Sequence, residues 1–80
     1  MPYLHQVSQI LRTTLGLGHR PLNQDTPLLG SLPELDSMAV ANLIVALEQY
    51  YGFEVHDDEI SARHFATVGT LSDFVASKMG

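Results

Sequence analysis

The stretch LPELDSMAVANLIVALEQYYG, from Leu32 to Gly52, decides the fold of this chain. Nine of the ten residues in its centre, MAVANLIVAL, are apolar, and that centre contains neither proline nor glycine. Such a run is typical of a helix, and Gly52 fits the C-cap that ends one. The pattern predicts a helix over residues 37–51, with an acid and a hydroxyl, Asp36 and Ser37, at its start.

The predicted helix has two different faces, because successive residues turn by about 100° around its axis. The residues predicted to point inward are Val40, Leu43, Ile44, Leu47 and Tyr51. Those predicted to point outward are Met38, Ala41, Asn42, Val45 and Gln49. The outward face therefore carries no charge, and a single acid, Glu48, lies on its flank.

Helical spacing also predicts a first helix over residues 3–15, with Pro2 acceptable at its start and Gly16 and Gly18 ending it. The residues on its apolar face are Leu4, Val7, Ile10, Leu11 and Leu15. Residues 17–35 then form a long connection rich in proline and leucine. We expect this loop to pack across the core, because five of its leucines, Leu22, Leu28, Leu29, Leu32 and Leu35, are spread through it and are too apolar to remain in solvent.

The C-terminal part is predicted to contain two further helices. Residues 60–65, ISARHF, fit one or two helical turns, and a last helix is expected from Thr70 to about Lys78. Thr70 and Asp73 resemble a capping box at its start. Its predicted buried residues are Leu71, Phe74, Val75 and Met79.

The link FEVHDDE, residues 53–59, is predicted to be briefly extended. Its acids, Asp57, Asp58 and Glu59, fit the solvated start of a helix. Two alternatives are an electrostatic docking surface and a weak divalent-cation site, although the spacing is not that of an EF-hand.

Together these elements predict an all-α fold: a small four-helix bundle in one domain over residues 1–80, with three main helices, one short third helix and a long first loop.

Composition excludes several classes of function. The chain has nine acidic and four basic residues and a formal net charge of −5, which argues against nucleic-acid binding. It has no cysteine, and its four histidines, His5, His19, His56 and His64, lack zinc-site spacing and are expected at the surface, so no metal site is predicted. No apolar run is long enough to insert into a membrane, and the N-terminus has no signal-type core, so the sequence predicts a cytoplasmic protein.

Ser37 admits two interpretations on its own residues. Asp and Ser are both common helix caps, so either side chain could simply cap the helix. A helix start also offers free N–H groups and the positive end of the peptide dipoles, which stabilise a phosphate ester. The spacing by itself favours the cap.

The surrounding sequence resembles the acyl carrier protein family along almost its whole length. LDSMAVANLIVALEQYYGFEV is similar to the family's Asp-Ser-Leu attachment motif and second helix, and VSQILRTTLGL is similar to its first helix. DTPLLGSL, DDEI and ATVGTLSDFV are similar to the loop before the serine, the entry to the third helix and the start of the last.

This resemblance implies that Ser37 is the attachment site of 4′-phosphopantetheine, transferred from coenzyme A by a phosphopantetheinyl transferase, with Asp36 helping that enzyme to recognise the site. The cofactor's thiol would hold acyl groups as thioesters, so the chain would be a monomeric carrier and not an enzyme. Its other partners would be the enzymes that load and accept the acyl group. The acyl chain would enter a pocket for which the candidates are Val40, Leu43, Ile44, Leu47, Phe65 and Val68; the aromatic residues Tyr50, Tyr51 and Phe53 would line or fill it.

The outward face departs from the fatty-acid-synthesis members of the family. Ala39 and Asn42 stand where those members typically show acids. One interpretation is drift on a solvated face. The other is a specialised carrier whose partners contact Met38, Ala41, Asn42, Val45 and Glu48, mainly through apolar groups.

Three alternatives to an acyl carrier remain at this stage. A peptidyl or aminoacyl carrier usually has glycines just before the serine, where this chain has Glu34 and Leu35. An unmodified interaction module would keep only the fold. A hydrolase using Ser37 would need a base and an oxyanion arrangement that the sequence does not place. The residues leave the cargo and the pathway, fatty-acid, polyketide or other, open.

Overall fold

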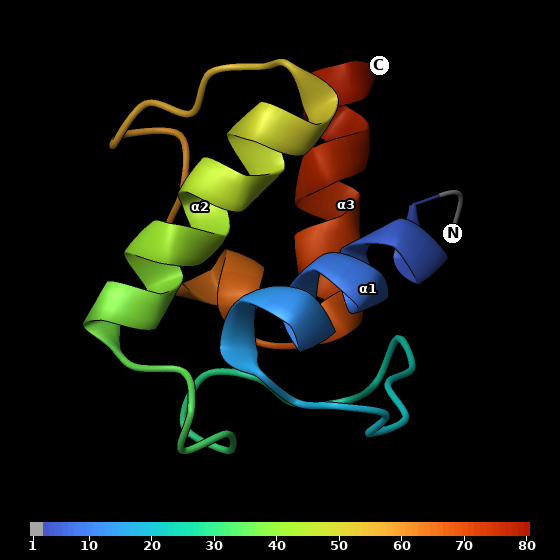
Figure 1. The fold of residues 1–80 in the computed structure, drawn as a ribbon. Coiled ribbons are helices and arrows are strands. Elements are labelled where there is room, and N and C mark those ends of the chain that lie inside the picture. The colour runs from blue at the N-terminus through green and yellow to red at the C-terminus, as the bar shows by residue number, and fades with distance from the viewer. Residues whose placement is uncertain (1–2) are drawn as a thin grey trace.

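The computed structural model describes residues 3–80 and consists of three α-helices and one short 3₁₀-helix (Figure 1). Their bounds are α1 Leu4–Leu15, α2 Ser37–Tyr51, η1 Ala62–Phe65 and α3 Val68–Met79. Within residues 3–80 there is no β-strand, only an isolated bridge between Pro27 and Thr67. The predicted all-α fold is confirmed. The expectation for Pro2 lies outside the described residues, and none of the described helices has the length and apolarity needed to cross a membrane.

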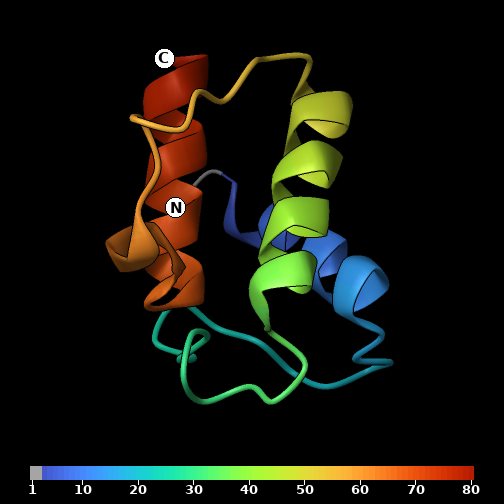
Figure 2. The same ribbon diagram turned by 90° about the vertical axis from the view of Figure 1, so that its left-hand side faces the viewer.

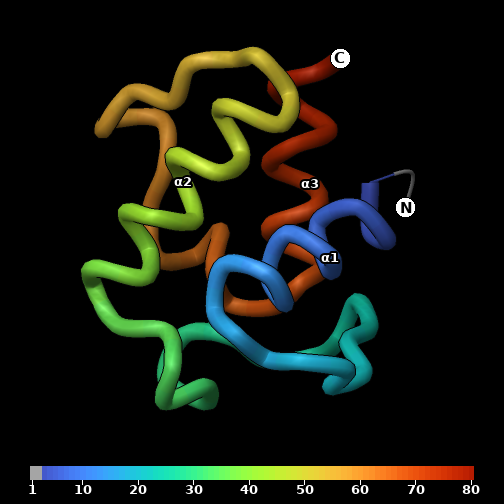
Figure 3. Tube along the Cα trace, viewed as in Figure 1, coloured from blue at the N-terminus to red at the C-terminus, as the bar shows by residue number. Residues whose placement is uncertain are grey.

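Helices α2 and α3 run in the same direction, and α1 packs against both of them (Figures 1 and 2). The chain returns from the end of α2 to the start of α3 through residues 52–67, which include η1 (Figure 3). α2 ends at Gly52, as predicted, in the left-handed conformation with φ 77° that glycine adopts readily. The return segment consequently lies beside α2, where it can form one wall of a cleft.

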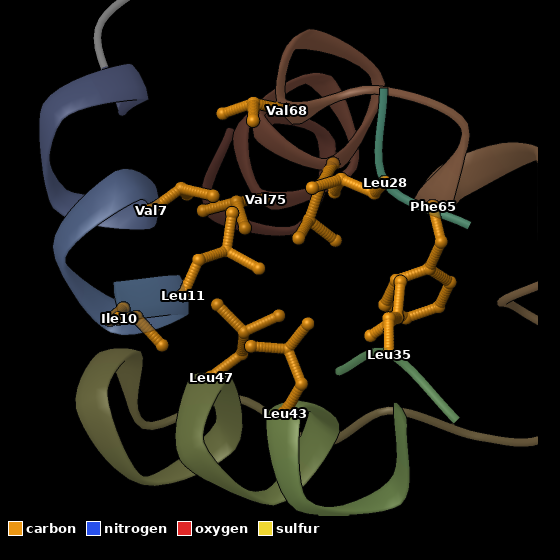
Figure 4. Packing of buried hydrophobic residues seen from close by; sticks show 11 residues of the cluster. Val7, Ile10, Leu11, Leu28, Leu35, Leu43, Leu47, Phe65, Val68 and Val75 are labelled. Carbon is orange, nitrogen blue, oxygen red and sulfur yellow. The ribbon is translucent and has the colours of Figure 1, made fainter. Parts of the chain in front are cut away.

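The core is formed by apolar residues from all helices and from the first loop (Figure 4). From α1 it takes the predicted face, with Val7, Ile10 and Leu11 buried. The loop also packs across the core as predicted, because Leu28 is 0 % exposed and Leu35 is buried. Leu29 was expected to pack in the same way, but it is 43 % exposed, since its neighbour Leu28 takes the inward position.

The buried part of the first loop is held by backbone hydrogen bonds to the segment around η1 and the start of α3. The N–H groups of Leu28 and Leu29 donate to the carbonyls of Ala66 and Phe65, both at 2.9 Å. In the other direction, the Val68 N–H donates to the Thr26 carbonyl at 3.1 Å. Backbone groups in a buried loop need such partners, and these bonds let the loop cross the core without a strand.

The prediction for the start of α3 was wrong by two residues. The N-cap is Thr67, and its hydroxyl accepts from the Thr70 N–H at 3.1 Å while the Thr70 hydroxyl accepts from the Thr67 N–H at 3.0 Å. The capping box therefore joins Thr67 to Thr70, not Thr70 to Asp73, whose side chain is exposed. At the other end Met79 is 44 % exposed and not buried as expected, whereas the predicted burial of Leu71, Phe74 and Val75 is confirmed.

The link between α2 and η1 has no extended strand and is held by side chains instead. A Glu48 carboxylate oxygen accepts from the Val55 N–H at 2.8 Å. Lys78 Nζ lies 2.6 Å from a Glu59 carboxylate oxygen, and the hydrogen bond from this ammonium group holds the pKa of Glu59 below its ordinary value. Lys78 also lies 5.8 Å from the centre of the Phe53 ring.

The acids of this link do not start a helix, because η1 begins at Ala62 and is capped by Ser61. Asp57 and Asp58 are exposed, while Glu59 ties the link to α3. Within residues 3–80 no group of three or more His, Asp or Glu side chains is close enough to hold a metal ion.

Candidate functional site: the start of helix α2 and the adjoining cleft

Asp36, and not Ser37, caps helix α2. The Asp36 backbone is extended and its Oδ1 accepts from the Ala39 N–H at 2.8 Å. Ser37 is the first helical residue, its side chain is exposed, and its hydroxyl makes no hydrogen bond within the described residues. The capping role thus falls to the acid, which leaves the hydroxyl free to react.

The first turn of α2 also keeps donors for an anion. The Val40 N–H donates to the Asp36 carbonyl, and the Ala39 N–H donates to the Asp36 side chain. The N–H groups of Ser37 and Met38 have no acceptor within residues 3–80. Together with the positive end of the helix dipole, they suit a negatively charged group on the Ser37 oxygen.

Replacing Asp36 with alanine is expected to lower the free energy of unfolding by about 1 kcal/mol, because the Ala39 N–H loses its acceptor. Asp36→Asn is the matched control, since asparagine caps helices about as well as aspartate. Urea denaturation followed by circular dichroism measures both. Equal destabilisation by the two substitutions would contradict a capping role for the side chain.

A cleft of about 520 Å³ opens beside Ser37, between α2 on one side and the end of the first loop and η1 on the other. Its lining residues are Leu29, Leu35, Asp36, Ser37, Val40, Ile44, Ile60, Ser61, Ala62 and Phe65. Three of these have polar side chains, Asp36, Ser37 and Ser61, and the rest are apolar. The cleft can therefore take an apolar group attached near the start of α2.

The structure brings half of the six predicted pocket residues to this cleft. Val40, Ile44 and Phe65 line it. Leu43, Leu47 and Val68 do not: each is 0 % exposed in the core, where Leu43 and Leu47 point toward α1 and α3 (Figure 4). Leu43 and Leu47 had been placed on the inward side by apolar periodicity, which marks the whole inward side of a helix and does not separate the core edge from the cleft edge.

Sequence reasoning missed the cleft residues that come from the first loop and from residues 60–62. The sequence offered some indication for Leu29 and Leu35, because leucines in a long loop were expected to pack on the core. It also offered some for Ile60, the first residue of the predicted short helix. Nothing in the sequence indicated that Ser61 and Ala62 would line a cleft, because small exposed residues have no distinctive pattern.

The aromatic residues of α2 lie outside the cleft. Tyr51 stacks on Phe53, with ring centres 5.7 Å apart, and its hydroxyl donates to the Gln6 side chain at 2.9 Å. Burial raises the pKa of Tyr51 to about 12. Tyr50 is 58 % exposed. These rings therefore neither line nor fill the cleft.

The outward face of α2 is confirmed as exposed and uncharged. Met38 is 73 % exposed and Val45 is 48 % exposed, and Ala41 and Asn42 are exposed between them. Glu48 differs from the other predicted contact residues, because it is half-buried and its carboxylate holds the Val55 N–H. Glu48, the one acid on the flank of this face, thus stabilises the link between α2 and η1 through its hydrogen bond to Val55.

The histidines divide into two kinds. His5, His19 and His56 are exposed, as expected. His64 was also expected at the surface, but it is half-buried in η1, with its ring 4.9 Å from that of Phe74.

A family model described as "Phosphopantetheine attachment site" matches residues 5–75 of the chain. The chain belongs to this family of phosphopantetheine-binding acyl carrier proteins. Curated relatives include the acyl carrier proteins of Tropheryma whipplei strains Twist and TW08/27. Each is 29 % identical over 72 residues, which cover 90 % of this chain and 84 % of the relative.

Two solved structures of acyl carrier proteins are also similar. The holo acyl carrier protein of Nitrosomonas europaea has a TM-score of 0.92 and 52 % identity, covering 99 % of this chain and 98 % of that one. The holo acyl carrier protein of Geobacter metallireducens has a TM-score of 0.80 and 29 % identity, covering 99 % and 87 %. Acyl carrier proteins hold phosphopantetheine and act as carriers rather than catalysts, as the resemblance implied.

Proposed function

We propose that Ser37 is the residue to which phosphopantetheine is attached, and that the chain delivers acyl thioesters to partner enzymes. The observation that carries this proposal is the exposed Ser37 hydroxyl, which is free because Asp36 caps the helix. The residues around it fit the cofactor's phosphate, for which the N–H groups of Ser37 and Met38 remain available.

In the proposed loading step the Ser37 oxygen forms the new bond to phosphorus as the diphosphate bond of coenzyme A breaks and adenosine 3′,5′-bisphosphate leaves. The hydroxyl proton passes to a base of the transferase. The two free N–H groups and the helix dipole stabilise the resulting negative charge. The cofactor supplies the thiol that this chain lacks, since it contains no cysteine. Intact mass after incubation with coenzyme A, magnesium and a broad-specificity transferase tests the proposal, with a gain of one phosphopantetheine as the expected result.

The cleft beside Ser37 supports an aliphatic acyl group as the cargo. Its volume lies in the range of small-molecule sites, and Asp36 is the one ionisable group among its lining residues. An aminoacyl or peptidyl group would place a charged amine or amides against apolar side chains without hydrogen-bond partners, which is unfavourable. The cleft thus favours the acyl carrier over the peptidyl carrier.

The uncharged face of α2 supports a specialised carrier whose partners contact Met38 and Val45. Charge complementarity mainly raises association rates and makes binding depend on salt. Binding to a ketosynthase of general fatty-acid synthesis, measured by surface plasmon resonance, is therefore expected to be weak and to change little between low and high salt. The double variant Ala39→Glu/Asn42→Asp, which introduces acids at the two positions where fatty-acid-synthesis members typically show them, is expected to gain salt-sensitive affinity. Tight, salt-sensitive binding of the unaltered chain would contradict the proposal.

A further inference from the structure

The cleft wall facing α2 is a single 3₁₀ turn, η1, which depends on its cap. Ser61, Ala62 and Phe65 all line the cleft, and η1 spans only four residues, Ala62–Phe65. A turn this short has little stability of its own, since forming a first turn costs more than its hydrogen bonds return. Its carboxyl end is held by the loop bonds to Phe65 and Ala66. The conformation of its amino end, Ser61 and Ala62, therefore depends on the bonds made there.

Those bonds form a reciprocal pair between Ser61 and His64. The Ser61 side chain accepts from the His64 N–H, and the Ser61 N–H donates to the His64 Nδ1 at 3.0 Å. In most capping boxes the second side chain is Glu or Gln, whose oxygen remains an acceptor throughout the neutral range. An imidazole nitrogen accepts only while it is unprotonated, and histidine changes its charge between about pH 5 and 8.

Two charged side chains share a surface pocket with His64. Arg63 of η1 and Asp73 of α3 line the same shallow surface pocket as His64, together with Thr70, Phe74 and Ser77. These are the charged side chains of the pocket, and the Asp73 carboxylate attracts an imidazolium while the Arg63 guanidinium repels it. The His64 carbonyl is held separately by the Thr70 hydroxyl at 3.1 Å, so the backbone stays anchored to α3 when the ring turns.

We propose that His64 is a positioning residue that makes the cleft wall sensitive to pH. Neutral His64 holds the Ser61 N–H and keeps η1 wound; protonated His64 releases it, η1 loosens, and the cleft opens. The meaning of this opening for cargo release rests on the function proposed above, whereas the change in η1 itself does not depend on it.

The test uses the Ser37→Ala chain, which carries no cofactor, so that its outcome is independent of loading. Backbone NMR shifts of residues 61–65 are followed from pH 8 to pH 5, together with the fluorescence of the apolar dye ANS as a reporter of cleft opening. We expect the helical secondary shifts of these residues to decrease and ANS fluorescence to rise, because losing one helix cap shifts the equilibrium between wound and loosened η1 by about fivefold.

Two substitutions, each added to the Ser37→Ala chain, distinguish loss of the Ser61–His64 hydrogen bond from other effects of lowering the pH. His64→Gln keeps an acceptor at this position but does not titrate, and it is expected to hold η1 wound at both pH values. His56→Gln removes an exposed histidine from the link and is expected to leave the transition unchanged. The proposal is overturned if the residue 61–65 shifts do not change with pH, or if His64→Gln undergoes the same transition as the unaltered side chain.

Discussion

Ser37→Ala is expected to abolish phosphopantetheine loading completely, because the oxygen that forms the ester is removed. The chain has no cysteine to replace it, and among residues 3–80 no other residue combines an exposed hydroxyl with the first turn of a long helix beside the cleft. The fold should be unaffected, since the exposed Ser37 side chain contributes no cap and no core contact. Intact mass reports the loading, and far-ultraviolet circular dichroism reports the fold.

Ser31→Ala is the matched control, because Ser31 is an exposed serine of the loop that precedes α2. It should load at the same rate as the unaltered chain. Full loading of Ser37→Ala would overturn the assignment of the attachment site. Failure of the unaltered chain to load with several transferases would instead favour an unmodified interaction module.

Leu28→Ala is expected to produce the largest loss of stability among single substitutions in the first loop, about 3–5 kcal/mol. Leu28 is 0 % exposed, so truncation leaves a cavity that the bundle can fill only in part. A chain of this length typically has a free energy of unfolding of only about 4–12 kcal/mol, so the variant should be close to unfolding at 25 °C. Urea denaturation measures the difference.

The adjacent residue provides the control for this prediction. Leu29 is 43 % exposed, and both residues donate through the backbone to the segment just before α3. Leu29→Ala removes the same atoms from a half-solvated position and is expected to cost less than about 1 kcal/mol. A similar loss for both substitutions would mean that the side chain of Leu28 does not supply the anchoring of the loop.

The start of α3 shows where a local pattern was insufficient. Val68 and Gly69 precede Thr70, and a β-branched residue followed by glycine does not look like the first turn of a helix. Both are nevertheless buried helical residues, because the backbone of the first loop bonds to Val68 and Gly69 and holds them against the core. The carbonyl groups that accept these bonds belong to Gln24 and Thr26. Both residues are far from α3 in sequence, so a local pattern around α3 cannot include them.

Helix α2 shows the opposite case. Its bounds, its buried and exposed faces and its glycine cap follow from spacing within one short segment, because helix formation and amphipathicity are local properties of a sequence. The sequence by itself therefore determined the helix, its uncharged outer face and the placing of Asp36 and Ser37 at its start.

The tertiary structure decided which residues meet beside Ser37. The cleft joins residues 29–37 and the adjoining Val40 and Ile44 edge of α2 to residues 60–65, which are distant along the chain. Apolar periodicity marks all inward residues of a helix alike. A cleft forms only where the segment opposite the helix, here residues 60–65, does not pack directly against it. The position of that wall is set by packing between segments, including the turn held by Ser61 and His64, and so it could be read only from the folded chain.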